Sequence, residues 1–255
     1  VEGPLHRYSF TADAQDSISG ADGEIFGTVT FDGQANFENA DGGNNSNGVG
    51  ANVGLQSPPA EAPGAYVDLP NGMIADLAEN ATFEVWATWD GALGSSWQRI
   101  FDFGTADAGE NFSSGGGASY NMFLTPRNSQ TATIRFGYRE GVGGVEQIVD
   151  GPAMVLGEQY HIAVVWDGDA QLVTLYVNGE QVGQNTLHFN LIDMLDADVN
   201  NWLGRAQWAD PMFDGGIDEF RIYPRALSWG ELVGNIAAGP DTVTDRRNAG
   251  QQRSR

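Results

Sequence analysis

The sequence of 255 residues contains no cysteine and no lysine. Without cysteine the chain has no disulfide, no thiolate ligand for zinc and no cysteine nucleophile. All 12 basic residues are arginine, and 34 acidic residues leave a formal net charge of −22 at pH 7. Phosphates would be repelled by this charge, so we expect neither nucleic acid nor an anionic membrane as a partner. No apolar run approaches 18 residues, which predicts that no helix inserts into a membrane.

The acidic, lysine-free composition has two interpretations. One is codon bias combined with a need for solubility. The other is adaptation to salt water, or a surface that binds divalent cations. Both fit an extracellular protein from a saline habitat. Residues 1–4 show no signal-peptide pattern, so we expect that a secreted form has already lost its signal peptide.

Short segments rich in Val, Ile, Phe, Tyr and Trp alternate with clusters of Gly, Asn and Asp, which is typical of β-strands joined by turns. Asp167-Gly168 and Asn178-Gly179 predict tight hairpin turns. So many short strands predict an all-β sandwich or barrel, with strand content well above the usual ~20–25%. The predicted strands are 5–10, 25–31, 65–69, 82–90, 98–103, 120–125, 132–139, 145–149, 159–167, 171–178, 181–188, 200–205 and 215–223.

Helical signals are few and lie mainly near the C-terminus. Residues 70–77 predict one turn. Ser228 and Glu231 have the spacing of a capping box, which predicts a short helix to about 237, before Gly239. The Gly/Asn-rich segment 39–54 predicts an exposed surface loop, including Asn44 to Gly50, with a calcium-binding loop as the alternative. Residues 107–119 predict a second loop, and the polar residues 240–255 predict an extension outside a domain at 5–239.

Seven motifs occur in a fixed order along the chain. They are AYVDLP (65–70), FEVW (83–86), WQRIFDFG (97–104), YNMFLTP (120–126), YHIAV with LYVNG (160–164 and 175–179), NWLGR (201–205) and FDGGIDEFRIY followed by RALS (213–223 and 225–228). Together they resemble the laminin G-like, concanavalin A-like jelly-roll domains of secreted bacterial proteins, over about residues 5–239. The resemblance implies a two-sheet antiparallel jelly-roll sandwich, and the helix pattern adds one short C-terminal helix. The motifs are specific for the fold and not for a ligand.

The alternation along residues 83–89 agrees with a sandwich. Phe83, Val85, Ala87 and Trp89 form one apolar face, which we assign to the core between the sheets. The opposite face is mixed, as expected for an outer or concave surface. We expect Phe83 and Trp166 to be buried.

Catalytic patterns are weak. A retaining glycosidase needs two carboxylates about 5–5.5 Å apart, and the pairs with i,i+2 spacing lie in turn or loop sequences: Asp22/Glu24, Asp167/Asp169 and Asp196/Asp198. The three histidines are scattered, and no motif supplies a nucleophile triad. We therefore expect a non-catalytic domain, and only two carboxylates on one face of a cleft would favour an enzyme.

Asp218 is the main candidate for a metal ligand. Strand alternation places it with Phe220 and Ile222, on a face that should turn inward, where an unpaired carboxylate is costly. The resemblance implies a structural Ca²⁺ between this strand and the N-terminal region, where Asp13 and Asp16 are the candidate second ligands. The alternative is that Asp218 accepts backbone N–H groups and binds no metal. Weaker candidates are the groups Asp193/Asp196/Asp198 and Asp210/Asp214/Asp218.

Sugar binding requires aromatic platforms beside polar groups, because a sugar ring has an apolar face and a rim of hydroxyls. The candidates are Trp97, Arg99, Tyr120, Trp208 and Asp210. The alternative is that both tryptophans seal the ends of the sandwich and the arginines pair with nearby acids. 

These patterns predict a non-catalytic extracellular recognition module that contains Ca²⁺ and binds a polysaccharide or a glycoprotein glycan. The alternative is a structural or adhesive surface protein whose domains assemble with copies of themselves into a filament or lattice, with residues 240–255 involved. A glycan-active enzyme is the third hypothesis.

Overall fold

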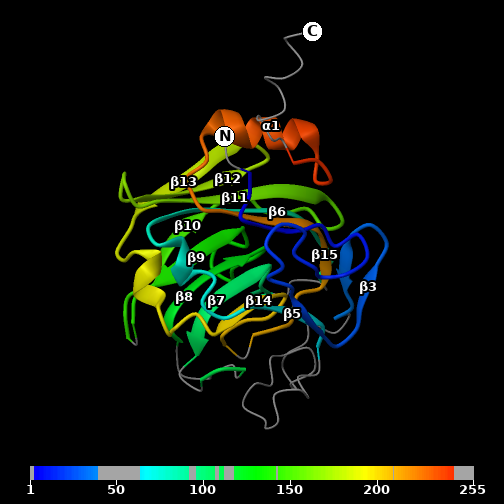
Figure 1. Cartoon of the computed structure of the whole chain (residues 1–255), viewed down its shortest axis with the longest axis horizontal. Helices are drawn as coiled ribbons and strands as arrows, with labels where there is room; N and C mark the ends of the chain where they lie inside the picture. Colours follow the sequence, from blue (N-terminus) through cyan, green and yellow to red (C-terminus); the bar gives the residue numbers. More distant parts are fainter. Residues whose placement is uncertain are drawn as a thin grey trace.

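The computed structural model describes residues 3–39, 64–91, 96–106, 109–111, 118–141, 143–208 and 210–243. Two antiparallel β-sheets face each other, and one C-terminal helix lies across the outside of one sheet (Figure 1). Strands account for 43% of the described residues. The two-sheet jelly-roll sandwich with one short C-terminal helix is thus confirmed. The expected exposed loop at Asn44 to Gly50 and most of the loop at 107–119 lie outside the described residues.

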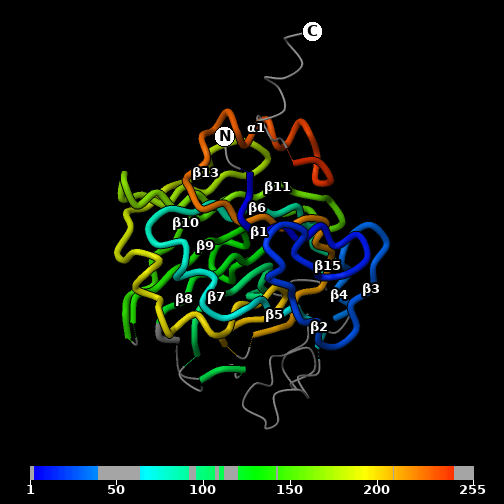
Figure 2. Tube along the Cα trace, viewed as in Figure 1, coloured from blue at the N-terminus to red at the C-terminus, as the bar shows by residue number. Residues whose placement is uncertain are grey.

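The first sheet has eight strands: β1 (His6–Tyr8), β3 (Val29–Phe31), β4 (Ala35–Phe37), β6 (Asn80–Trp89), β11 (Gln159–Asp167), β12 (Leu172–Val177), β13 (Glu180–Thr186) and β15 (Gly215–Tyr223). Their order is β13-β12-β11-β6-β15-β4-β3, and β1 also pairs with β15. The N-terminal segment therefore lies beside the last strand (Figure 2).

The second sheet has seven strands: β2 (Glu24–Phe26), β5 (Tyr66–Leu69), β7 (Phe101–Ala106), β8 (Ala118–Thr125), β9 (Arg135–Arg139), β10 (Gln147–Asp150) and β14 (Asn200–Leu203). Their order is β10-β9-β8-β7-β14-β5-β2. Three helices complete the described chain: the 3-10 helices η2 (Ala75–Leu77) and η3 (Leu191–Met194), and the α-helix α1 (Trp229–Ala238). In the part of the chain that the structure describes, no helix combines the length and apolar character needed to cross a membrane.

The core lies between the two sheets and is rich in aromatic rings. Phe83 and Trp166 are fully buried there, as predicted. The ring of Phe83 on β6 contacts Phe101 and Phe103 on β7, at centroid distances of 5.9 and 5.7 Å. These contacts join the sheets, and burial of a large aromatic side chain contributes about 1.5–3 kcal/mol.

The predicted strand at 25–31 is in fact two strands in different sheets. β2 pairs with β5 in the seven-stranded sheet, whereas β3 pairs with β4 in the other. Gly27 lies between them with φ +69°, and a Cβ there would approach the carbonyl oxygen of Gly64 to 2.5 Å. The chain thus changes sheet at a glycine that no other residue could replace without strain. β4 has no counterpart among the predicted strands.

The two predicted hairpin turns differ in length. Asn178 and Gly179 both have positive φ, 50° and 81°, as a tight two-residue turn requires. The turn at Asp167-Gly168 is longer, because β11 ends at Asp167 and β12 begins at Leu172. There the left-handed residue is Gln171, with φ 55°.

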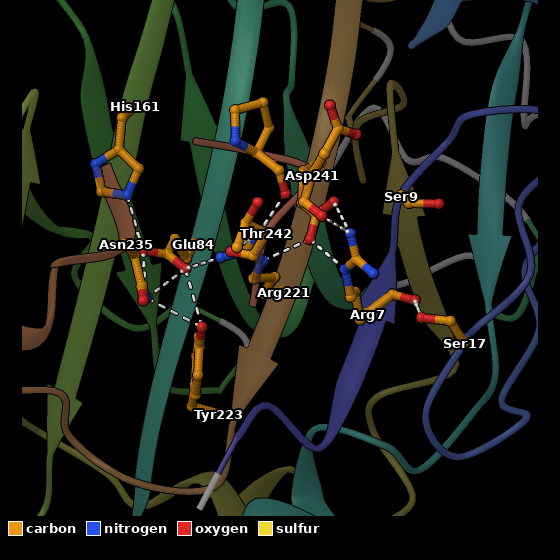
Figure 3. Close-up of polar contacts among 12 residues, drawn as sticks. Arg7, Ser9, Ser17, Glu84, His161, Arg221, Tyr223, Asn235, Asp241 and Thr242 are labelled. Carbon is orange, nitrogen blue, oxygen red and sulfur yellow. Dashed lines mark hydrogen bonds and ion pairs between the residues drawn. The ribbon is translucent and has the colours of Figure 1, made fainter. Parts of the chain in front are cut away.

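Helix α1 begins with the predicted capping box. The Ser228 N–H donates to the Glu231 carboxylate at 2.9 Å. The helix covers the outer face of the eight-stranded sheet, here named the helix-side face, where a polar cluster surrounds Glu84 (Figure 3). The Glu84 carboxylate accepts hydrogen bonds from Asn235 of α1 at 3.0 Å, and it pairs with His161 of β11 at 2.8 Å. These contacts fix the helix to the sheet.

The residues after α1 are also bound to this face. The guanidinium of Arg7 donates to the carbonyl of Asp241 at 3.2 Å, and that of Arg221 donates to the carbonyl of Thr242 at 3.2 Å. The first residues of the segment 240–255 are therefore attached to the sandwich, and residues 244–255 lie outside the described chain.

Candidate functional site

The outer face of the seven-stranded sheet, turned away from the inter-sheet core, carries aromatic and charged side chains. Asp102 on β7 lies opposite Phe123 on β8 and Trp202 on β14. Trp202 in turn lies opposite Asp68 on β5. Side chains alternate along a strand, so these four residues share one face, and neighbours such as Phe103 point into the core. Two cavities open on this face.

The first cavity, here named the tryptophan pocket, has a volume of about 220 Å³. Its lining residues are Trp97, Arg99, Phe123, Arg139, Glu146, Trp208 and Asp210. Trp97 and Trp208 come from loops and are half-buried, whereas Phe123 and Arg139 belong to strands of the rigid sheet. Aromatic rings beside charged hydrogen-bonding groups are suited to a sugar, which needs both an apolar surface and polar partners.

Arg99 is the fixed centre of the tryptophan pocket. It is 2% exposed, and its guanidinium forms ion pairs with Asp102 at 3.2 Å and Asp210 at 2.9 Å. It also lies 4.2 Å from the ring centroid of Phe123 and donates to the carbonyl of Trp97. Burial raises the pKa of Asp102 to about 7, and the Arg99 charge opposes that rise. Arg99 is thus committed to protein partners and positions Trp97 and Asp210.

Arg139 has a different environment in the same pocket. Its guanidinium lies over Trp208, 5.2 Å from the ring centroid. Its ion pair with Glu146 spans 3.9 Å, which is too long for a hydrogen bond. The Nε atom is shielded from solvent and has no hydrogen-bond partner among the described residues. Arg139 therefore retains hydrogen-bonding capacity inside the cavity.

Four of the five residues proposed from sequence for ligand binding meet in this pocket: Trp97, Arg99, Trp208 and Asp210. Tyr120 does not join them. It packs edge-to-face against Phe189 at 5.2 Å and lies against the inter-sheet core. The reason is alternation, because its neighbour Asn121 is the residue that takes the outer face, opposite Gly104.

Sequence analysis missed Phe123, Arg139 and Glu146. Strand alternation could have predicted that Phe123 lies on the outer face, since it is two residues from Asn121 and shares its face. Arg139 is the last residue of β9, and Glu146 precedes β10. Only the pairing of β8 with β9, which long-range topology decides, brings them beside Trp208.

The second cavity, here named the acidic pocket, has a volume of about 460 Å³. Its lining residues are Asp22, Glu24, Phe26, Tyr66, Asp68, Leu69, Pro70, Asn71, Glu110 and Asn111. Glu24 on β2 is the direct cross-strand partner of Asp68 on β5, so the two carboxylates share a face of the sheet. Phe26 and Tyr66 stack beside them at 4.7 Å. Sequence analysis found Asp22/Glu24 as a spacing pair but did not pair Glu24 with Asp68.

Asp68 is the perturbed acid of this pocket. Burial raises its pKa to about 7, and the charges of Glu24 and Glu110 add to the rise. Its Oδ1 atom is shielded from solvent and has no hydrogen-bond partner among the described residues. An acid that stays partly protonated near neutral pH can donate a proton, which is the property of a general acid.

The proposed metal ligands are not brought together as expected. Asp16 is 5% exposed, and its carboxylate accepts hydrogen bonds from the backbone N–H groups of Arg7 and Ile18 and pairs with His6. Burial opposes ionisation, but the hydrogen bonds from His6, from Ser19 and from the backbone N–H groups of Arg7 and Ile18 together outweigh it and hold the pKa of Asp16 well below its usual range. Its oxygens are thus already occupied.

Asp13 and Asp218 lie in more open positions. Asp13 is exposed and accepts the N–H of Gln15 at 3.0 Å. The expectation that Asp218 faces inward with Phe220 and Ile222 is wrong, because a β-bulge shifts the register between Ile217 and Glu219.

The bulge places Asp218 at the surface, where it accepts a hydrogen bond from Gln159 at 2.8 Å. The buried carboxylate of this strand is Glu219, whose partners are Arg7 at 2.6 Å and Arg221 at 2.5 Å. No group of three or more His, Cys, Asp or Glu side chains among the described residues could hold a metal ion.

The model of the concanavalin A-like lectin/glucanases superfamily matches residues 61–233, and the chain belongs to this family.

Among solved structures, the chain is similar to domain 4 of AbnA, a GH43 extracellular arabinanase from Geobacillus stearothermophilus, in complex with arabinotriose. The identity is 20%, the match covers 91% of this chain and 98% of that chain, and the TM-score is 0.61. It is also similar to the IT-sialidase CBM40 of Ruminococcus gnavus, with 19% identity, 73% and 91% coverage, and a TM-score of 0.51. At these identities the likeness shows the fold. No curated protein matches the chain.

Proposed function

We propose that the chain is a non-catalytic, extracellular module that binds a glycan in the tryptophan pocket. The observation that carries the proposal is the position of Trp97 and Trp208 around Arg99, in a cavity on the outer face of the sheet. Two pieces of support come from a neighbour of the same fold, the arabinanase domain. It is described as part of an extracellular enzyme, and it was solved with arabinotriose bound.

The test measures oligosaccharide binding by isothermal titration calorimetry, with ligands chosen from a glycan array and arabinotriose included. Trp208→Ala removes a platform of the pocket, and we expect at least a tenfold loss of affinity, about 1.4 kcal/mol or more. Trp229→Ala is the matched control, because Trp229 lies on α1, is 60% exposed and lies outside the pocket. Equal effects of the two substitutions would contradict the proposal, as would an array without a single bound glycan.

A second candidate function, glycan hydrolysis, is favoured by one specific observation, the Glu24–Asp68 pair in the acidic pocket. As the general acid, Asp68 would protonate the glycosidic oxygen, and Glu24 would serve as the second carboxylate of the pair. The assay is release of reducing ends from each glycan that binds. Activity that Asp68→Asn and Glu24→Gln both abolish would establish an enzyme, and no release above the double variant would support the non-catalytic module.

Calcium and self-assembly remain proposals of lower rank. Calcium would draw on Asp218 together with backbone carbonyls and water, since Ca²⁺ takes six to eight oxygens. Self-assembly into a filament or lattice would involve residues 240–255, of which 244–255 lie outside the described chain. Sedimentation velocity of the full chain and of a chain ending at 243 tests self-assembly. If both chains sediment as monomers, the self-assembly proposal is contradicted.

A further inference from the structure

The two arginines of the tryptophan pocket differ in how far the protein satisfies them. Arg99 has two carboxylates, at 3.2 and 2.9 Å. Arg135, next to the pocket with its guanidinium 5.7 Å from the Trp97 ring centroid, forms two hydrogen bonds to Asp150 at 2.7 and 2.9 Å. Among the described residues, Glu146 is the one acidic partner of Arg139, at 3.9 Å. Of these three arginines at the pocket, Arg139 therefore has the weakest ion pairing.

The surroundings of Arg139 make this incomplete pairing costly. Its side chain is 19% exposed, and the Nε atom is shielded from solvent and has no hydrogen-bond partner in the described part of the chain. A buried donor that lacks an acceptor loses the hydration it would have in water. The guanidinium fork matches a carboxylate, which can accept two parallel hydrogen bonds. An anionic acceptor arriving in the cavity would therefore supply what the protein does not.

Trp208 and Glu146 define how such a ligand would enter. The guanidinium of Arg139 lies over the Trp208 ring, which limits its movement, so the fork is already oriented. Glu146 is 28% exposed and makes no hydrogen bond to Arg139. The Glu146 side chain can therefore turn into solvent at little cost in free energy. A carboxylate of the ligand can then pair with Arg139 in its position.

We propose that Arg139 makes the tryptophan pocket selective for glycans that carry a carboxylate. The proposal deepens the glycan-binding function and rests on it. The carboxylate of the sugar pairs with Arg139 and takes the place of Glu146, while the sugar ring contacts Trp208. Uronic acids and sialic acids both present this group, and the experiment separates the two sources.

The experiment compares each acidic ligand with a neutral partner by titration calorimetry at low salt. The pairs are trigalacturonic acid with its methyl ester, and sialyllactose with lactose. For the acidic member that binds, we expect at least a tenfold tighter dissociation constant than for its neutral partner, since charge-assisted hydrogen bonds are about twice as strong as neutral ones. Binding of trigalacturonic acid alone assigns the source as a uronic acid, and binding of sialyllactose alone assigns it as a sialic acid.

Two variants then change the acidic preference in opposite directions. Arg139→Gln should lower affinity for the acidic ligand about tenfold more than it lowers affinity for the neutral ligand. Glu146→Gln should raise acidic affinity a few-fold, because it removes the competing carboxylate. Arg225→Gln is the matched control, since Arg225 pairs with Glu231 at 2.9 Å and lies outside the pocket.

The outcomes separate this proposal from the function on which it rests. Binding of neutral glycans without an acidic preference would overturn the selectivity and leave glycan binding intact. An equal loss of acidic and neutral binding in Arg139→Gln would also overturn it, because Arg139 would then only support the pocket. No binding of any ligand would overturn both.

Discussion

The two outer faces of the sandwich use the same residue types in different ways. On the helix-side face, Trp86, Arg221 and Glu84 lie beneath α1 and are at most 4% exposed. On the outer face of the seven-stranded sheet, Trp208 and Arg139 also form a tryptophan–arginine contact, but beside a cavity. The covering element makes the difference. Helix α1 and the residues after it cover these three side chains, whereas two cavities remain open on the second face.

The difference teaches how to separate structural from ligand-binding polar groups in this fold. Glu84 accepts hydrogen bonds from Asn235, Tyr223 and His161 and pairs with Arg221 at 3.5 Å, so it has no remaining need for a partner. Each face holds buried atoms without a hydrogen-bond partner among the described residues: Nη1 of Arg221 and Nδ1 of His161 lie in the covered cluster, whereas Nε of Arg139 and Oδ1 of Asp68 belong to residues that line cavities. Buried polar groups normally have partners, and a cluster that lacks them beside a cavity indicates a site for a ligand.

The largest expected effect is on the covered face. Glu84→Ala leaves Arg221 and His161 without their shared carboxylate, and we expect a loss of about 3–5 kcal/mol in the free energy of unfolding. Glu146→Gln is the comparison on the other face and should cost less than about 1 kcal/mol, because its ion pair is long and partly exposed. Urea denaturation monitored by tryptophan fluorescence measures both. Similar losses for the two variants would remove the distinction between the faces.

A pair of tryptophans tests the same contrast. Trp86 is 4% exposed and contacts both Arg221 and His161, with ring centroids of Trp86 and His161 4.5 Å apart. Trp86→Ala should cost about 3 kcal/mol. Trp208→Ala should cost about 1 kcal/mol or less, because Trp208 is half-buried and its role is in binding. If thermal melts show Trp208→Ala to be the more destabilising change, Trp208 seals the sandwich instead of lining a binding pocket.

Much of the fold was accessible from sequence because it depends on local patterns. The alternation at 83–89, the Asn178-Gly179 turn and the capping box at Ser228 each specify their element directly. The departures have long-range causes. Glycine at 27 permits a change of sheet, but its contact with Gly64 comes from a distant segment. The β-bulge at Asp218 breaks strict alternation, and one extra residue moves a carboxylate from the core to the surface.

The candidate site was only partly accessible for the same reason. Trp97 and Trp208 stand out beside polar residues in loop sequences, so composition alone finds them. Arg139 and the Glu24–Asp68 pair depend on which strands become neighbours, and strand pairing is not local information. Tyr120 was predicted to bind a ligand and instead packs against the core. The alternation of side chains along its strand decides which of the two faces an aromatic ring takes, and the sequence did not reveal that alternation.

The carboxylates of Asp68 and Glu84 differ in their hydrogen bonds. Glu84 accepts several, whereas the Oδ1 atom of Asp68 has no partner among the described residues. The pKa of Asp68 in the folded protein, about 7, lies above its ordinary value of 3.8. The folded state therefore binds a proton more tightly than the unfolded state, and this contribution to stability is lost as the pH rises through about 4 to 7. Asn cannot ionise, so Asp68→Asn should be more stable than the natural chain at pH 8, by on the order of 2 kcal/mol.

The same substitution should have little effect at pH 4, where Asp68 is protonated in the folded state. Denaturation at both pH values measures the difference, with Asp76→Asn as an exposed control. An identical change in unfolding free energy at pH 4 and pH 8 would show that Asp68 keeps an ordinary pKa, and it would weaken the case for a general acid in the acidic pocket.

The smallest expected effect concerns calcium. Asp218 lies at a β-bulge near the surface, and among the described residues the Gln159 amide is its one side-chain hydrogen-bond partner. A cation there would exchange a single hydrogen bond for metal coordination. A site this open should bind Ca²⁺ weakly.

At a Ca²⁺ concentration equal to the dissociation constant, binding raises the free energy of unfolding by RT ln 2, about 0.4 kcal/mol. We expect the melting temperature to rise by one or two degrees (~1–2 °C) between EDTA and millimolar Ca²⁺, and Asp218→Asn to abolish the rise. Asp32→Asn, an exposed aspartate on the β3–β4 turn, should leave the rise unchanged. Identical melting curves of the natural chain in EDTA and Ca²⁺ would rule out this site, and Asp218 would then serve only to accept the Gln159 hydrogen bond at the bulge.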